Sequence, residues 1–329
     1  MSVSTLFHFA LGFLALVGAA AIAAALMLAS PVRPPPTLAS IHEGAMQINE
    51  AGAPDLSRFQ ARDGTWLAYR LYPAATGARD RIAILAHGSS ASSIEMHQVA
   101  KALAEAGVTA VAVDFRGHGA SGTRGDIGYS GELDDDLADL VAELRKANPA
   151  ARFSLIGHSA GGGFALRVAD SPLGEKFDRF VLLAPYLGYS APTNRPAEGP
   201  GLWAAADTPR IVATLMLERI GIDWPQSLPA LAFANAPEAK MNVTSQYSFR
   251  LMTNYTAPPD WKGALLRAKG RIAVVAGADD QLMDAEAYRR VLPPLGVALT
   301  ILPGVDHMGV VYQPEAIKAI LAATAEPGA

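Results

Sequence analysis

A serine set between small residues, Ser159, is the residue whose surroundings point most directly to chemistry. The stretch Gly-His-Ser-Ala-Gly from Gly157 to Gly161 fits the pattern GxSxG, and it lies between a predicted strand at 153–156 and a predicted helix at about 162–169. A serine on so tight a strand-to-helix turn is held in a strained backbone conformation that lifts its hydroxyl clear of the sheet. Since glycines at a helix start also serve packing alone, the pattern predicts a nucleophile only together with a base.

An acid and a histidine follow the serine along the chain, each in a loop after a predicted strand. A serine hydroxyl attacks at neutral pH when a base removes its proton and a third group orients that base. His307, the only histidine after the serine, follows the last predicted strand, and Asp279 and Asp280 follow the strand before it. Active sites of open parallel sheets lie at the carboxyl ends of the strands. The order serine, acid, histidine therefore predicts a catalytic triad, with either aspartate as its acid.

Two backbone N–H groups in the same region could stabilise the negative charge that develops on a substrate carbonyl. Ala160 directly follows the serine and offers one N–H at the helix start, where the backbone dipoles favour an anion. The loop AHGSSAS at 86–92 follows a predicted strand and offers the second. Because His87 and Gly88 also fit an ordinary turn at the end of a strand, the loop is predicted to supply an oxyanion donor only if Ser159 is the nucleophile.

Five short motifs, in this order, resemble those of a known family. They are HGSS at 87–90, VDFRGHGAS at 113–121, GHSAGG at 157–162, GADD at 277–280 and DHMG at 306–309. Over residues 59–323, and more weakly inside an insertion, the chain is similar to the α/β-hydrolases, in the branch of monoacylglycerol lipases, lysophospholipases and serine aminopeptidase-like hydrolases. The resemblance implies an eight-stranded sheet with a helical cap over the site.

The resemblance also implies roles for individual residues. It implies Ser159 as the nucleophile, His307 as the base, and the backbone N–H groups of Ser89 and Ala160 as the oxyanion hole. In the family's usual pattern the acid stands three residues after the glycine of its loop, which here selects Asp280. We expect no cofactor and no metal.

Short apolar runs separated by helix-length segments predict the sheet that carries these loops. Such runs are typical of strands buried on both faces, so we expect an α/β fold with a mostly parallel sheet between helices. Before them, two alternating runs about Asp63-Gly64 predict a β-hairpin. The predicted strands lie at 81–86, 109–113, 153–156, 180–184, 271–276 and 298–302.

The alternation of strands and helices stops after residue 186, which predicts an insertion. Residues 187–262 hold three of the four tryptophans and no clear strand. An insertion of this length is usually functional, such as a lid. We therefore expect a hydrolase core at 57–186 and 263–325 beneath a cap formed by the insertion.

Aromatic side chains of the insertion are expected to form mainly its own small core, while a few line a pocket for an apolar substrate. The stretch RIVATLMLERIG at 210–221 predicts a helix within the insertion. With the loop positions given above, the predicted pocket residues are His87, His158, Trp203 and Met308.

The first segment differs in kind from the rest of the chain. Residues 9–29 carry no charge, and as a helix they would span about 31 Å, the thickness of a bilayer's hydrocarbon core. We expect residues 1–30 to be a single-pass anchor, in the inner membrane of a bacterial cell, before a Pro-rich linker at 31–56 with a short helix at 41–50. A cleaved signal peptide, leaving a secreted or periplasmic protein, is the alternative, although its apolar region usually has about 7–15 residues. The side of the membrane stays open, since Arg33 is the only nearby strong cation.

Composition excludes several other classes of protein. A net charge of −4 with scattered basic residues provides no basic surface for nucleic acid, and the absence of cysteine excludes disulfides, thiolate nucleophiles and cysteine zinc sites. The glycines at 117–122 match the dinucleotide pattern GxGxxG, but no helix is predicted to begin within them, as such a site requires. Asp134 to Asp136 open a predicted helix, where a charge run is typical of a solvated first turn.

These predictions together favour a membrane-anchored serine hydrolase that cleaves a carboxylic ester, with a glycerolipid such as a monoacylglycerol or lysophospholipid as substrate. A peptidase that removes N-terminal residues is one alternative, and it needs an acidic group in the cap to bind an ammonium. A non-catalytic binding protein of the same fold is the other alternative. The acidic candidates in the cap are Glu198, Asp207, Glu218, Asp223 and Glu238.

Overall fold

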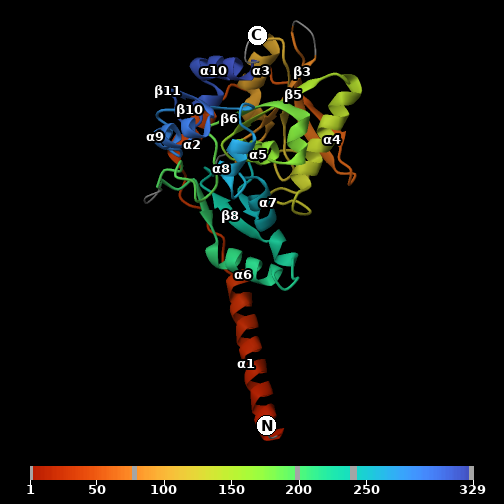
Figure 1. The fold of residues 1–329 in the computed structure, drawn as a ribbon, viewed down its shortest axis with the longest axis vertical. Coiled ribbons are helices and arrows are strands. Elements are labelled where there is room, and N and C mark those ends of the chain that lie inside the picture. Colours follow the sequence, from red (N-terminus) through yellow and green to blue (C-terminus); the bar gives the residue numbers. More distant parts are fainter. Residues whose placement is uncertain (1–2, 76–79, 197–200, 238–242, 326–329) are drawn as a thin grey trace.

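An eight-stranded sheet runs through the centre of the computed structural model, which describes residues 3–75, 80–196, 201–237 and 243–325 (Figure 1). Its strand order is β1-β2-β4-β3-β5-β6-β10-β11. The first two strands and the β2–β4 pair are antiparallel, and every later neighbour is parallel. The strands are β1 (Leu56–Gln60), β2 (Trp66–Tyr72), β3 (Arg81–Ala86), β4 (Thr109–Val113), β5 (Arg152–His158), β6 (Phe177–Leu183), β10 (Ile272–Gly277) and β11 (Ala298–Leu302).

The predicted α/β fold is confirmed, including the hairpin and all six later strands, with shifts of a few residues at some strand ends. The central strands were readable because helices cover both faces of the sheet and leave β3 to β6 almost entirely buried. The hairpin turns at Gly64, whose φ of 87° favours glycine. The carboxyl ends of the parallel strands therefore meet at one edge, where the loops with candidate catalytic residues lie.

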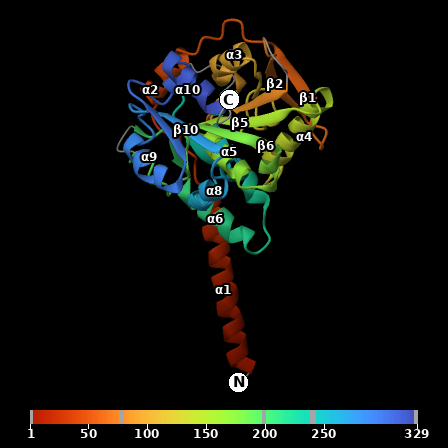
Figure 2. The same cartoon turned by 45° about the horizontal axis from the view of Figure 1, so that its top comes forward.

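Helices cover both faces of the sheet (Figure 2). On one face α3 (His97–Glu105) packs against α10 (Pro314–Thr324), and on the other α5 (Ala160–Ala169) packs against α8 (Trp261–Arg267). An ion pair of 2.7 Å from Arg167 to Asp134 joins α5 to α4 (Glu132–Ala147). A further helix, α9 (Ala285–Val291), follows β10.

The insertion after β6 holds a small antiparallel sheet, in the order β7-β8-β9, as well as helices. The expectation of no strand there was wrong. These strands are only three to five residues long, and β7 and β8 are rich in alanine, which has little strand preference, so no alternating pattern marks them. The elements are β7 (Ala204–Ala206), α6 (Thr208–Glu218), η4 (Trp224–Ser227), β8 (Pro229–Phe233), β9 (Gln246–Ser248) and α7 (Phe249–Asn254).

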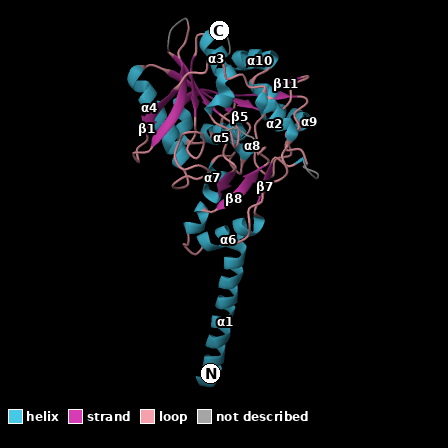
Figure 3. Cartoon of the chain, turned by 180° about the vertical axis from the view of Figure 1, so that it is seen from behind, coloured by secondary structure: helices cyan, strands magenta, loops and turns pink. Residues whose placement is uncertain are grey.

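The N-terminal helix α1 (Val3–Leu28) projects away from the rest of the molecule, and none of its residues is buried (Figures 1 and 3). It has 26 residues, of which an 18-residue stretch has a mean hydropathy of 2.5, so it is long and apolar enough to cross a membrane. After it the chain runs along the insertion, where the Leu38 N–H donates to the Ala234 carbonyl at 3.2 Å. The helix predicted in this stretch is α2 (Ala39–Met46), and it packs on the core through buried Ile41.

A buried cluster of charges fixes the loop after β4 to α4. The Arg116 guanidinium lies 2.7 Å from Asp136, 3.4 Å from Glu132 and 2.9 Å from Asp63. The expectation that Asp136 lies in a solvated first turn was wrong, because it is only 5% exposed. The sequence shows the charge run but not the arginine from another loop that pairs with it.

Removing the arginine of this cluster should destabilise the fold. Arg116→Gln leaves the carboxylates of Asp136 and Glu132 buried without a cation, and breaking such a pair costs about 3–5 kcal/mol. We expect that loss in the free energy of urea unfolding. The control is Arg289→Gln, which breaks an exposed pair with Glu286 and should change stability by less than about 1 kcal/mol. Equal effects of the two substitutions would contradict the role of the cluster.

Candidate active site

Ser159 occupies a strained turn between β5 and α5. Its φ of 52° and ψ of −114° lie where a residue with a side chain is rarely found, at a cost on the order of 1–3 kcal/mol. The Ser159 N–H donates to the Leu183 carbonyl of β6 at 2.8 Å, which holds the turn against the sheet. A Cβ on Gly161 would lie 2.7 Å from the Ala86 carbonyl, and one on Gly157 would lie 2.7 Å from the next turn of α5. The two glycines of the motif are therefore required by close backbone packing.

His307 and Asp280 come together from the loops after β11 and β10. The Nδ1 of His307 lies 2.8 Å from Oδ2 of Asp280, and both side chains are buried. Since a carboxylate only accepts, the proton of this bond belongs to Nδ1, and Nε2 of the neutral ring is free to accept another. The other Asp280 oxygen accepts N–H bonds from Leu282 at 2.8 Å and Met283 at 2.7 Å.

These contacts determine the ionisation of the carboxyl. Burial alone would raise the pKa of Asp280, but electrostatic attraction to the His307 imidazole, its hydrogen bond and the hydrogen bonds from two backbone N–H groups outweigh burial. They hold the pKa below its usual range. The carboxylate therefore stays charged at neutral pH, as a group that orients an imidazole must.

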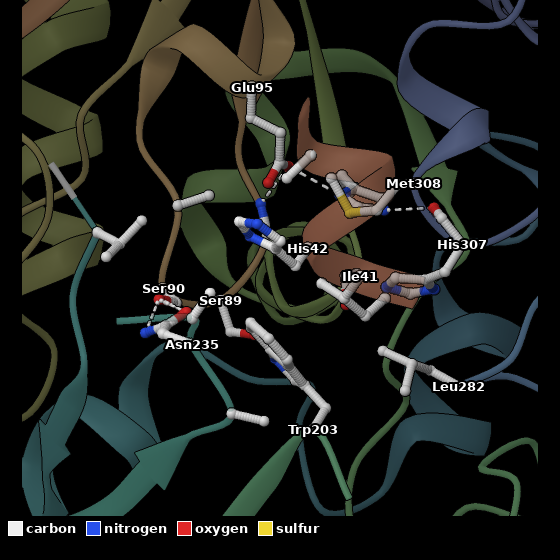
Figure 4. A pocket seen from close by; sticks show the side chains of 18 residues that line it. Ile41, His42, Ser89, Ser90, Glu95, Trp203, Asn235, Leu282, His307 and Met308 are labelled. Atoms are coloured by element: carbon white, nitrogen blue, oxygen red, sulfur yellow. Dashed lines mark hydrogen bonds and ion pairs between the residues drawn. The ribbon is translucent and has the colours of Figure 1, made fainter. Parts of the chain in front are cut away.

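Ser159 and His307 line one cavity (Figure 4), whose wall also includes Gly88, Ser89 and Trp203. Among the hydrogen bonds of the described residues, none joins the Ser159 hydroxyl to the imidazole of His307. Catalytic hydrogen bonds are often long in structures without a substrate. Proton transfer between the two would require them to approach when a substrate binds.

Of the two residues predicted to supply oxyanion donors, Ser89 lines this cavity, and Ala160 directly follows Ser159, which also lines it. Neither the Ser89 N–H nor the Ala160 N–H donates one of the described hydrogen bonds, and Ala160 is the first residue of α5, whose first N–H groups have no partner within the helix. The amides on either side of Ser89 are committed, that of Gly88 to Glu95 at 2.7 Å and that of Ser90 to the Tyr247 hydroxyl at 2.9 Å. The loop therefore leaves an N–H free where the prediction needs one.

A buried Glu95–His158 pair, absent from the sequence predictions, links the loops of the site. One Glu95 oxygen lies 2.7 Å from Nδ1 of His158 and also accepts the Gly88 N–H, while Nε2 of His158 lies 3.1 Å from the His307 carbonyl. Both partners of the ring only accept hydrogen bonds, so both nitrogens carry protons and His158 is an imidazolium. Sequence spacing gave no signal for Glu95, because its importance comes from its burial.

Three of the four predicted pocket residues, His158, Trp203 and Met308, line the cavity. The indole N–H of Trp203 donates to the Ser89 hydroxyl at 2.8 Å. The fourth, His87, is not among the lining residues: it is fully buried beneath the loop, where burial lowers its pKa and its Nδ1 donates to the Gly88 carbonyl at 2.8 Å. Its place in the motif had suggested a position at the pocket.

The segment that the sequence assigned to a linker forms part of the cavity wall. Ile41, His42 and Ala45 of α2 line the cavity, and Figure 4 shows Ile41 and His42 beside His307. Gly44 allows this approach, because a Cβ there would lie 2.6 Å from Cβ of Met308. Contacts between residues as far apart in the chain as Gly44 and Met308 leave no local sequence pattern by which they could be predicted.

No group of three or more His, Cys, Asp or Glu side chains that could hold a metal occurs among the described residues. Glu198 and Glu238, two of the acidic residues considered for ammonium binding, lie outside the described residues.

The order and direction of the strands, with helices on both faces of the sheet, define an α/β-hydrolase fold. The chain belongs to the serine aminopeptidase (S33) family, whose sequence model matches residues 77–310. A monoacylglycerol lipase from Mycolicibacterium smegmatis is 30% identical to it over 128 residues, which are 39% of this chain and 45% of that protein. The matched region thus spans less than half of that lipase.

Solved structures share the fold over much longer stretches. A soluble variant of Saccharomyces cerevisiae monoglyceride lipase, in complex with a substrate analogue, has a TM-score of 0.59 at 15% identity and covers 83% of this chain and 96% of its own. A bacterial membrane phospholipase A has a TM-score of 0.56 at 18% identity and covers 96% of this chain and 97% of its own.

The Glu95–His158 pair predicts a pH-dependent contribution to stability. Burial would lower the pKa of His158 and raise that of Glu95, but their mutual attraction outweighs burial, so the pKa of His158 is above its ordinary 6.5 and that of Glu95 below its ordinary 4.5. The histidine's contribution is complete below pH 6.5 and is lost as pH rises through its raised pKa. The glutamate's is complete above pH 4.5 and is lost only as pH falls through its lowered pKa.

Glu95→Gln should therefore destabilise the protein most at about pH 5–6.5, by about 3–5 kcal/mol. The difference between this variant and the wild type in the free energy of urea unfolding should shrink steadily as the pH is raised to 9. Glu286→Gln, at an exposed pair, serves as control and should show no such trend. A Glu95→Gln deficit that is constant with pH would contradict the charged state of the pair.

Proposed function

We propose that this hydrolase cleaves carboxylic esters of glycerolipids through Ser159, His307 and Asp280. The observation that carries the proposal is the strained Ser159 at the end of β5, lining the same cavity as a histidine whose Nδ1 is held by a buried carboxylate. That combination supplies a nucleophile, a base and a group that orients the base.

In the proposed reaction, Nε2 of His307 accepts the Ser159 proton as the hydroxyl oxygen bonds to the ester carbonyl carbon. The negative charge that forms on the carbonyl oxygen is stabilised by the N–H groups of Ser89 and Ala160. The imidazolium then gives its proton to the leaving alcohol, and an acyl-serine remains. Water, activated by the same base, releases the carboxylic acid and restores the serine.

The cavity favours an ester over a peptide substrate. The only acidic residue among its described lining residues is Glu95, which His158 already neutralises. Asp207 accepts hydrogen bonds from the Ser30 hydroxyl and the Arg210 N–H, and Glu218 and Asp223 do not line the cavity. Among the described residues that line the cavity, no carboxylate is therefore free to bind a peptide's ammonium.

A lipid substrate fits the apolar wall and the N-terminal helix. Apolar side chains from α2 and from the loops, among them Ile41, Leu282 and Met308, face the cavity. The names of the matched mycobacterial and yeast lipases support an acylglycerol. We propose α1 as a membrane anchor, since it is long and apolar enough to cross a bilayer. We propose residues 187–262 as the cap, since Trp203 and Asn235 of this segment line the cavity.

Ser159→Ala should abolish labelling by a fluorescent fluorophosphonate and lower kcat for p-nitrophenyl esters by a factor on the order of 10⁶. Ser227→Ala, at an exposed serine in the cap, is the matched control and should label like the wild type. Labelling that persists in Ser159→Ala would refute the nucleophile, and a wild type that neither labels nor hydrolyses would favour a non-catalytic binding protein. Turnover of amino-acid nitroanilides without ester turnover would favour the peptidase.

Substitution in α2 should change the preference for chain length. Ala45 is exposed at the cavity, so Ala45→Trp should obstruct long acyl chains and raise KM for p-nitrophenyl palmitate about tenfold, or about 1.4 kcal/mol, with little effect on the acetate. Met46→Trp places the same side chain one residue along, outside the cavity lining, and should leave both values unchanged. Equal KM values for the two variants with both esters would contradict a role of α2 in binding the substrate.

A further inference from the structure

Exposed apolar side chains form a stripe on the outer face of the insertion. We call this stripe the α6 face. The spacing i, i+3 and i+4 places its first three side chains on one side of α6, and the other two follow within six residues of the helix end. Between 39% and 71% of the surface of each of these residues is exposed. Large apolar side chains that are exposed together usually mark a contact surface. The residues are Val212, Leu215, Met216, Ile220 and Trp224.

The end of α1 is fixed to α6 beside this face. Arg210 donates from Nε to the Leu28 carbonyl at 2.9 Å and from another nitrogen to the Ser30 carbonyl, so it caps the carboxyl end of α1. The Ser30 hydroxyl donates to Asp207 at 2.7 Å, the residue that caps the start of α6. In Figures 1 and 3, α6 lies across the end of α1. The angle between the two helices is therefore set by directed hydrogen bonds.

The length of α1 determines the depth at which α6 would lie. Residues 3–23 are exposed along their whole length, whereas Ala24, Met27 and Leu28 are partly covered where α1 packs on α6. The exposed part would span about 31 Å as a helix, the thickness of the hydrocarbon core. If this part crosses the bilayer, the core ends where the contacts with α6 begin.

We infer that the α6 face lies in the interfacial layer of the bilayer that α1 crosses, with a lipid surface as its partner. The inference rests on the anchoring role proposed above for α1. A helix with one apolar side, lying across a membrane-spanning helix at the level of the headgroups, buries that side among the upper parts of the acyl chains. Exposed Trp224 fits the same layer, where tryptophan is enriched. The α6 face and α1 would thus contact the same bilayer.

Site-directed fluorescence tests this directly, because the chain has no cysteine and each substitution adds a single labelling site. The full-length protein carries Met216→Cys or Ile220→Cys, is labelled with the dye NBD and is reconstituted into phosphatidylcholine vesicles. Vesicles contain lipids with a doxyl quencher near the headgroup or near the middle of the acyl chain. Leu14→Cys in α1 reports on the anchor, and Ala322→Cys in α10, at the far end of the molecule from α1, is the matched aqueous control (Figure 1).

We expect the shallow quencher to remove most of the fluorescence at positions 216 and 220, the deep quencher to act mainly at position 14, and neither to act at position 322. Quenching at 14 without quenching at 216 and 220 would overturn the inference while leaving the anchor intact. No quenching at any position would overturn both. Labels at 216 and 220 that are shielded from aqueous iodide but insensitive to doxyl lipid would identify a second copy of the chain as the partner and would also overturn it.

Discussion

The backbone at Ser159 is the constraint on which the rest of the site depends. The chain must turn from β5 directly into α5 beneath the loop after β3, and it can do so only with a serine at positive φ between glycines that lack a Cβ. This conformation is costly locally, and the buried sheet and the N–H bond to Leu183 maintain it. The same turn places Ser159 at the cavity, directly before the first N–H groups of α5.

Other elements then bring their side chains to that fixed point. Asp280 orients His307 from one direction, and the Glu95–His158 pair connects the Gly88 amide to the His307 carbonyl from the other. Because the pair is buried, neither the loop of Gly88 nor the loop of His307 can shift far without leaving a charge unpaired in an apolar interior. The chain between α1 and β1 contributes as well, since residues of α2 line the cavity and Leu38, just before α2, is bonded to Ala234 of the insertion.

Features of the fold that have a local sequence pattern could be predicted, and features that depend on residues far apart in the chain could not. Buried parallel strands and the GxSxG turn are local patterns, so the sheet was predicted almost strand by strand. The positions of Asp280 and His307 followed from strand ends and from family motifs, and their meeting in space agrees with that expectation. The roles of Glu95, Ile41 and Asp136 depend on partners far along the chain, and the strands β7 to β9 are too short to show a period. These features became visible only with the fold.

Trapping the acyl-enzyme tests the central claim most directly. The protein is mixed with a p-nitrophenyl ester, quenched in acid within the first turnovers, digested and mapped by tandem mass spectrometry. The account predicts one added acyl group, on the Ser159 oxygen of the peptide that contains GHSAGG. An acyl group on any other side chain, with Ser159 unmodified while the ester is consumed, would contradict it.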